Sequence, residues 1–178
     1  KDVGKEIAGA RFDIDWRELD YLRRAGELAA PVLLFHGDAD EKVPVATSAK
    51  LAELRPDLVT LSVGPNDITR ERSLWAYARD IEAILGTLTR STTAVVVVNL
   101  IPDLTVTPRF KGKEIEARVH ECVIAFNNLL ITRVRAQGAE VVNLYAASRQ
   151  EVPGRPELIG ADRYHPSDDG YARWAELM

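Results

Sequence analysis

The pattern that decides the fold is clearest in the stretch Leu58-Val59-Thr60-Leu61-Ser62-Val63-Gly64-Pro65-Asn66-Asp67. A short, largely apolar run is followed at once by glycine, proline and two polar residues. The apolar run is typical of a buried strand, and the Gly-Pro-Asn-Asp segment is typical of the turn that ends one. We therefore predict a strand over residues 58–63 that delivers Asn66 to one edge of a sheet.

Three further runs resemble this one, and helical patterns separate them. The other predicted strands are Pro31–His36, Ala94–Leu100 and Ala139–Tyr145. Amphipathic patterns predict helices at Asp15–Ala29, Val45–Leu54, about 74–88, Lys113–Gln137 and from Ser167 onward, whereas 146–164 is typical of an irregular loop. Strands that alternate with helices indicate βαβ units, so the fold class is α/β, with a mostly parallel sheet of about four strands.

The handedness of βαβ crossovers predicts how the helices cover this sheet. If the strands lie side by side in chain order, right-handed crossovers place all three connecting helices on one face. The first and last helices must then cover the other face, which makes Trp16 and Trp174 packing residues. The result is a three-layer, flavodoxin-like sandwich that forms a single domain over residues 1–178.

Composition limits the classes of function. The chain has 178 residues and a formal net charge of −4, which gives no sign of nucleic-acid binding. The single cysteine, Cys122, excludes an internal disulfide and, with three histidines, argues against a structural metal site; no cofactor is expected. No apolar run is long enough to span a membrane. The first residues, Lys1–Gly4, show no secretory signal, which favours a cytoplasmic location and leaves secretion after processing open.

Near the end of the chain a carboxylate precedes a histidine by three residues, in Asp162-Arg163-Tyr164-His165-Pro166. Histidine titrates near neutrality, so His165 can take and return protons. An aspartate at this spacing can bond the second ring nitrogen and fix the tautomer, as the acid of a serine triad does. The alternative is an ordinary helix start, with Ser167 or Asp168 as the cap and His165 as a loop residue.

The predicted strand ends bring other polar residues to the same edge. Gly37-Asp38-Ala39-Asp40 follows the first strand, Asn66-Asp67 the second and Asp103 the third. Ligands of parallel sheets bind outside the carboxyl ends of the strands, so we predict one site at this edge. The Asn66 amide could donate to a developing oxyanion there. Alternatively, Asn66 forms an Asx-type turn or caps a helix.

These residues resemble the blocks of a known family. Residues 55–67 resemble the Gly-x-Asn-Asp block of the SGNH (GDSL-type) hydrolases, and Asp162–Pro166 resembles their Asp-x-x-His-Pro block. The segment Asn99–Asp103 also looks like the part between those blocks, so the resemblance covers about residues 51–178. It implies ester hydrolysis, with Asn66 as an oxyanion donor, His165 as the general base and Asp162 as its orienting acid.

The N-terminal part departs from that pattern. The family places its nucleophile in Gly-Asp-Ser, whereas the matching position here reads Gly37-Asp38-Ala39, and the second block is missing. Residues 12–56 instead resemble the C-terminal part of an α/β-hydrolase. Within them Pro31–Pro44 resembles the late strand of that family, and this likeness implies that Asp40 is the triad acid. The sequence has no Gly-x-Ser-x-Gly nucleophile elbow, and the catalytic histidine block expected after that strand is absent too. The chain therefore resembles a chimera, with residues 1–56 from an α/β-hydrolase and 57–178 from an SGNH hydrolase.

Two functions remain open. The first is a carboxylic ester hydrolase scaffold that keeps Asn66, Asp162 and His165 but lacks its serine, so that activity on a small acyl ester is weak or absent. Ser48 lies about a turn too far along its helix to replace that serine and has no identifiable partner. The second is a folded recombinant or engineered domain without catalytic function. In either case a lost strand could expose a sheet edge and allow homodimers to form.

Overall fold

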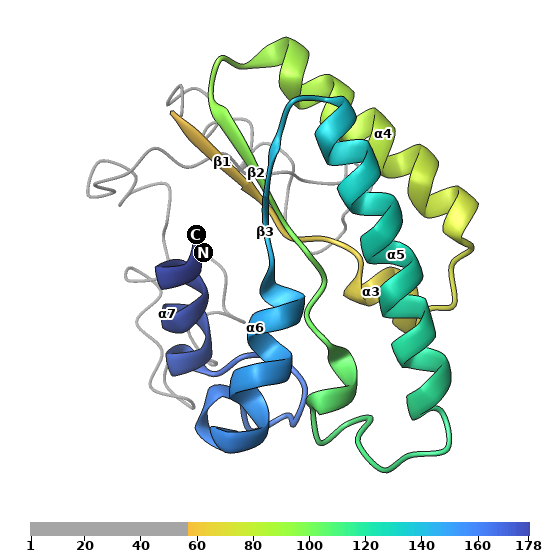
Figure 1. The fold of residues 1–178 in the computed structure, drawn as a ribbon, viewed down its shortest axis with the longest axis vertical. Helices are drawn as coiled ribbons and strands as arrows, with labels where there is room; N and C mark the ends of the chain where they lie inside the picture. The colour runs from red at the N-terminus through yellow and green to blue at the C-terminus, as the bar shows by residue number, and fades with distance from the viewer. Residues whose placement is uncertain (1–56) are drawn as a thin grey trace, which may run out of the picture. The chain divides into compact units, whose positions relative to one another are not determined.

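The computed structural model describes residues 57–178, and within them Val59–Met178 form one compact unit. Its sheet contains β1 (Leu58–Leu61), β2 (Val95–Asn99) and β3 (Glu140–Val142), in the order β1-β2-β3. The last two pair in parallel, with Val98 opposite Val141 (Figure 1). The predicted α/β class, the parallel sheet and the chain-order arrangement of these strands are confirmed. The predicted strand Pro31–His36 lies outside the described residues.

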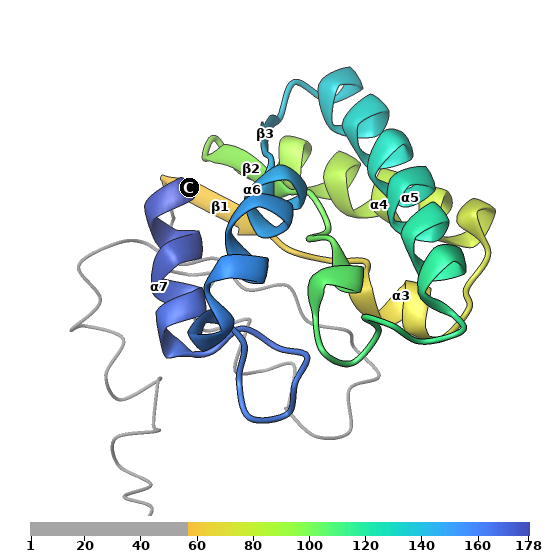
Figure 2. The same ribbon diagram turned by 60° about the horizontal axis from the view of Figure 1, so that its bottom comes forward.

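Two long helices cover one face of the sheet. They are α4 (Leu74–Ser91) and α5 (Glu116–Ala136), which pack side by side in both ribbon views (Figures 1 and 2). Alternation along β1 sets this face, since Val59 and Leu61 are buried whereas Thr60 and Ser62 are exposed. The core beneath the helices is formed by apolar side chains that are almost fully buried: Val59, Tyr77, Ile81, Leu85, Leu88, Val98, Val123, Leu130 and Val134.

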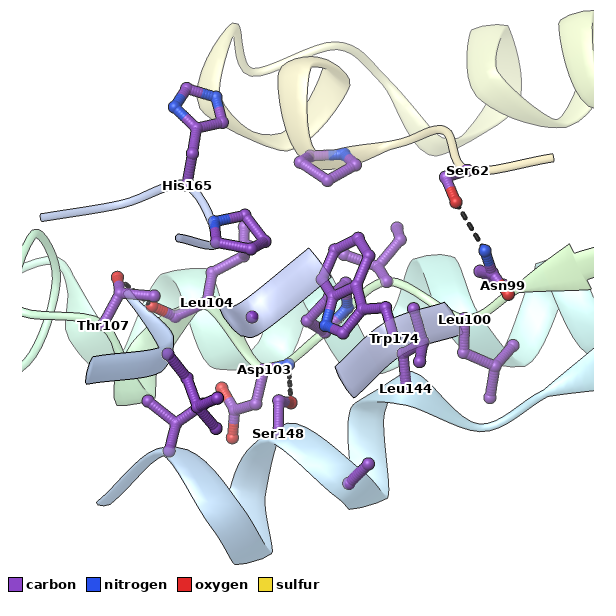
Figure 3. A pocket seen from close by; sticks show the side chains of 18 of the residues that line it. Ser62, Asn99, Leu100, Asp103, Leu104, Thr107, Leu144, Ser148, His165 and Trp174 are labelled. Carbon is purple, nitrogen blue, oxygen red and sulfur yellow. Dashed lines mark hydrogen bonds between the residues drawn. The ribbon is translucent and has the colours of Figure 1, made fainter. Parts of the chain in front are cut away.

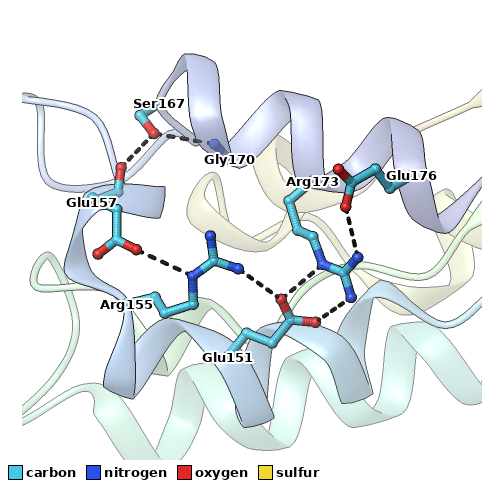
Figure 4. Close-up of polar contacts among 7 residues, drawn as sticks. All are labelled: Glu151, Arg155, Glu157, Ser167, Gly170, Arg173 and Glu176. Atoms are coloured by element: carbon cyan, nitrogen blue, oxygen red, sulfur yellow. Dashed lines mark hydrogen bonds and ion pairs between the residues drawn. The ribbon is translucent and has the colours of Figure 1, made fainter.

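The last helix, α7 (Asp168–Leu177), lies on the other side of the sheet from α4 and α5, beside α6 (Leu144–Glu151) (Figure 2). An ion pair joins the two helices: Arg173 Nε and Nη2 donate to the two carboxylate oxygens of Glu151 at 2.9 and 3.0 Å (Figure 4). The predicted helix layers on both faces are therefore present. Trp174 is half-buried on α7, and its predicted partner Trp16 lies outside the described residues.

Several boundaries differ from those predicted. The segment 146–164 is not an irregular loop, since it continues α6 and contains the short 3₁₀ helices η3 (Val152–Gly154) and η4 (Pro156–Leu158). The strand predicted to reach Tyr145 ends at Val142 because the side chain of Asn143 accepts from Ala146 N–H and starts α6. The helix predicted from Lys113 begins at Glu116.

Serine side chains cap the first turns of two of the helices. Ser73 caps α4 by accepting from Ala76 N–H, whereas Asp67 and Thr69 lie within the short helix α3 (Pro65–Thr69). Ser167, one of the two predicted caps, starts α7 by accepting from Gly170 N–H at 3.1 Å. Hydroxyl caps of this kind stabilise a helix by satisfying one of its free N–H groups.

Other predictions fall on residues that the structure does not describe. They are the helices Asp15–Ala29 and Val45–Leu54, the single domain over residues 1–178 and the exposed edge of the first strand; all remain predictions. None of the helices within residues 57–178 combines the length and apolar character that a membrane span requires.

Candidate functional site

A tight turn holds the sequence Asp162-Arg163-Tyr164-His165 just before α7. Gly160 N–H donates to the His165 carbonyl at 2.8 Å, and Arg163 N–H donates to the Gly160 carbonyl at 2.9 Å. An antiparallel bridge between Ile159 and Pro166 closes the base of the turn. Arg163 adopts a left-handed backbone, with φ of 67°, which disfavours non-glycine residues by about 1–2 kcal/mol. Because the turn is closed by backbone bonds, Asp162 and His165 face one another.

The two side chains make direct contact. His165 Nδ1 lies 2.5 Å from Asp162 Oδ2, and Asp162 Oδ1 accepts from the backbone N–H groups of Tyr164 and His165, each at 3.0 Å. The bond with His165 and these two backbone bonds lower the pKa of Asp162 to about 2. At neutral pH the carboxylate is therefore ionised and Nδ1 is the donor, which leaves Nε2 free to accept a proton. The predicted contact between Asp162 and His165 is present, and Ser167 caps α7 as the alternative predicted. The role of His165 remains a prediction.

Asn66 lies in α3, directly after the strand end. The cap of α3 is Gly64, whose φ is 115°, and a Cβ there would overlap the side chain of Ile101. This is a conformation and a close approach that only glycine tolerates. The alternative that Asn66 caps a helix is wrong, because it lies inside α3. Its exposed side chain makes no hydrogen bond to another described residue, so its amide is free to donate to a ligand.

A cavity of about 540 Å³ brings these elements together. Asn66, Asp67, Asp103 and His165 all contribute to its wall, as predicted for polar residues at one sheet edge. Asp162 is not among the described residues that line it, so it contacts the site through His165. The rest of the wall is mainly apolar and comes from the segment that follows β2, from α6, from η4 and from α7 (Figure 3). It includes Leu100, Leu104, Leu144, Leu158 and Trp174.

The carboxylate of Asp103 is bonded to neighbouring protein groups at this edge. Its carboxylate is buried, and Oδ1 accepts from Thr105 N–H at 3.0 Å and from Thr105 Oγ1 at 2.6 Å. Oδ2 lies 3.6 Å from His120 Nδ1 and 3.7 Å from Arg149 Nε. His120 therefore faces a buried carboxyl group. Cys122, on the same helix as His120, is half-buried.

Ser62 is one of two serines in the cavity wall, the other being Ser148. Ser62 follows β1 rather than lying inside a strand, as the sequence predicted, and its Oγ accepts from Asn99 Nδ2 at 2.6 Å (Figure 3). No histidine or carboxylate is hydrogen-bonded to this hydroxyl in the described part of the chain. It therefore lacks the adjacent base that activates a serine nucleophile.

The remaining candidates lie outside the described residues. These are Gly37, Asp38, Ala39, Asp40 and Ser48, whose roles remain predictions. Over residues 57–178, histidine, cysteine and carboxylate side chains do not gather in any group that could hold a metal ion.

Comparison with known proteins identifies relatives for most of the chain. The model of the GDSL-like lipase/acylhydrolase family matches residues 16–173. A GDSL-like esterase of Mycobacterium tuberculosis is 32% identical over 124 residues, which cover 69% of this chain and 39% of that protein. The chain thus spans about two-fifths of the length of this relative. The family match begins inside the segment 12–56, whose likeness to α/β-hydrolases stays a prediction.

Solved structures share the fold. A lipase/acylhydrolase from Enterococcus faecalis has a TM-score of 0.53 at 20% identity, covering 72% of this chain and 62% of its own. An acetylxylan esterase from Geobacillus stearothermophilus has a TM-score of 0.56 at 14% identity, with coverages of 75% and 62%. At these identities the likeness concerns the fold alone. The family match over residues 16–173 shows that the chain belongs to the GDSL-like lipase/acylhydrolase family.

Proposed function

We propose that this chain is a carboxylic ester hydrolase scaffold of the SGNH type that retains Asn66, Asp162 and His165 as its site. The observation that carries the proposal is the contact of 2.5 Å between Asp162 and His165, beside a cavity that Asn66 also lines. The esterase named among the relatives supports the same reaction class. The substrate would be a small acyl ester.

Each residue has a distinct task in this proposal. Asp162 fixes the His165 tautomer, so that Nε2 faces outward as the base. The Asn66 amide donates a hydrogen bond to the oxygen that gains negative charge as the carbonyl is attacked. His165 then returns its proton to the departing alkoxide, which leaves as an alcohol.

The nucleophile is where this chain departs from its family. Ala39 stands where the family pattern has serine, so we propose that no acyl-enzyme forms. Water takes its place: its oxygen attacks the carbonyl carbon, and its proton passes to His165 Nε2. Loss of the covalent step makes such hydrolysis slow, although oxyanion stabilisation and binding alone still accelerate a reaction.

A second candidate is a chain without catalytic function, and the sequence Gly37-Asp38-Ala39 favours it. In that case the chain is a folded chimera, with an α/β-hydrolase-like segment at 1–56. In that segment Asp40 would lack the serine and histidine with which such an acid forms a triad. Homodimers through a sheet edge would accompany either candidate. Light scattering on the purified chain measures this directly, since a dimer has twice the mass.

An ester assay separates the two candidates. We expect saturable hydrolysis of p-nitrophenyl acetate that disappears in His165→Ala and persists in the matched control His120→Ala. His120 is the other histidine in the described residues, and it faces Asp103 instead of Asp162. Rates equal to buffer in the parent chain, or equal rates in the parent and His165→Ala, would support the chain without catalysis.

A gain-of-function variant tests the position of Ala39. If Ala39 occupies the site of the family's nucleophile, Ala39→Ser should be labelled covalently by a fluorophosphonate, and labelling should be lost in the double variant with His165→Ala. Intact-mass spectrometry measures the adduct. Absence of an adduct in Ala39→Ser would mean that residue 39 does not reach His165.

A further inference from the structure

The turn that carries Asp162 and His165 is held by a neighbouring loop, residues 107–111. Backbone bonds order this loop: the N–H groups of Phe110 and Lys111 both donate to the Thr107 carbonyl, at 3.1 and 2.9 Å. From this loop, Arg109 N–H donates to the Arg163 carbonyl at 3.1 Å. The bond joins the loop to the one residue of the turn whose backbone is left-handed.

Side chains make a second connection through Tyr164. The Arg109 guanidinium carbon lies 4.7 Å from the centre of the Tyr164 ring. The Phe110 ring meets Tyr164 edge to face, with centroids 5.8 Å apart and planes at 77°. Both contacts are of the favourable cation–π and aromatic kinds, and Phe110 and Tyr164 are buried. The Tyr164 ring is therefore fixed on two sides by Arg109 and Phe110.

Tyr164 in turn contacts the ring of His165. Their centroids are 4.8 Å apart and their planes meet at 66°. The His165 side chain is 62% exposed, so little else among the described residues restrains it apart from its bond to Asp162. A catalytic base must be held in place, because small displacements reduce the rate of proton transfer.

We infer that Tyr164, held by Arg109 and Phe110, is the positioning residue that keeps the His165 ring on Asp162. The inference rests on the proposed function in taking His165 as the base, but its consequence is a property of the imidazole itself. With the Tyr164 ring in place, the neutral His165 carries its proton on Nδ1. Without that support, the ring rotates away from Asp162 and both tautomers are populated.

NMR spectroscopy of the isotope-labelled full chain reads the tautomer without any turnover. The chain has three histidines, and loss of one set of signals in His165→Gln assigns those of His165. In the parent chain we expect the Nδ1–H tautomer. Arg109→Gln changes an exposed side chain and leaves the backbone N–H that bonds the Arg163 carbonyl in place. In this variant we expect a mixture of tautomers and a weaker Nδ1 proton signal.

Further variants distinguish a positioning role from a general loss of structure. Tyr164→Leu should behave as Arg109→Gln does, whereas Tyr164→Phe should keep the parent tautomer, because the Tyr164 hydroxyl has no partner in the described part of the chain. Arg79→Gln is the matched control, since Arg79 lies 5.4 Å from the ring of the exposed Trp75 and should leave His165 unchanged. If Tyr164→Leu fails to fold, as judged by circular dichroism, Arg109→Gln alone decides.

The outcomes separate this inference from the proposed function. Parent-like Nδ1–H signals in Arg109→Gln would overturn the positioning role. A mixture of His165 tautomers in Arg79→Gln as large as that in Arg109→Gln would overturn it too. A parent chain without any preference for Nδ1–H would overturn it as well. A parent chain with the Nδ1–H tautomer but no ester hydrolysis would contradict the proposed function only.

Discussion

Asn127 on α5 makes two hydrogen bonds to the backbone of Ile101, with Oδ1 accepting from Ile101 N–H at 2.8 Å and Nδ2 donating to the Ile101 carbonyl at 2.9 Å. Both residues are buried. The pair attaches α5 to the segment that leads from the end of β2 along the wall of the cavity. Because Ile101 also contacts Gly64, this attachment supports the strand ends that carry the site.

Replacing Asn127 should therefore destabilise the protein strongly. In Asn127→Leu the N–H and carbonyl of Ile101 lose their partners in a buried place, so we expect the free energy of unfolding to fall by about 2–4 kcal/mol. Urea denaturation measures this. Asn128→Leu, the same exchange at the exposed neighbouring position, should change stability by less than about 0.5 kcal/mol. Equal losses in the two variants would contradict the role of the bonds.

Gly64 should be far less tolerant of a side chain than Gly112. Both have positive φ, at 115° and 72°, but an added Cβ meets Ile101 and Tyr77 at Gly64 and nothing within 4 Å at Gly112. We expect Gly112→Ala to lower the free energy of unfolding by about 1 kcal/mol from backbone strain alone. Gly64→Ala should lose about 1–3 kcal/mol more through overpacking. Thermal and urea denaturation measure the loss of stability in each variant. Equal losses in the two would contradict the close approach of Ile101 to residue 64.

Asp162 should make stability depend on pH in the acid range. Its pKa in the folded chain is about 2, below the value of about 3.9 for an unfolded aspartate. A carboxyl whose pKa is lowered by folding stabilises the fold above the unfolded pKa and loses that effect as the pH falls through the folded one. The stability difference between the parent and Asp162→Asn should therefore shrink between about pH 4 and pH 2. Denaturation curves across this range would contradict the prediction if the difference stayed constant.

The attachment of α7 to α6 should depend on Glu151. Arg173 bonds both Glu151 across the two helices and Glu176 within α7, the latter at 2.8 Å (Figure 4). In Glu151→Gln we expect backbone amides of α7 to exchange with deuterium faster, because within residues 57–178 this ion pair is the link between Arg173 and α6. Glu176→Gln keeps the link to α6 and should show smaller changes. Hydrogen exchange followed by mass spectrometry distinguishes the two, and equal exchange would contradict the proposed attachment.

Local patterns in the sequence were sufficient for much of the described fold. The apolar runs predicted β1 and β2, the apolar stripes predicted α4 and α5, and Ser167 was recognised as a cap because a hydroxyl before a helix bonds its first N–H groups. The helix α6 was missed, since its start depends on the Asn143 cap within a run that otherwise resembles a strand. Such short segments are ambiguous from periodicity alone.

The sequence by itself determined the alternation of β1, β2 and β3 with the long helices α4 and α5, although it missed α3 and α6. It also placed Asp162 three residues before His165, because this depends only on spacing along the chain. Only the tertiary structure decided which distant groups meet: Asp103 with His120, Asn127 with Ile101, and Arg109 with Tyr164. Such contacts depend on how helices pack on the sheet, and no local pattern in the chain encodes that packing. The left-handed backbone of Arg163 also depends on a contact between distant parts of the chain, since Arg109 N–H in a separate loop bonds its carbonyl.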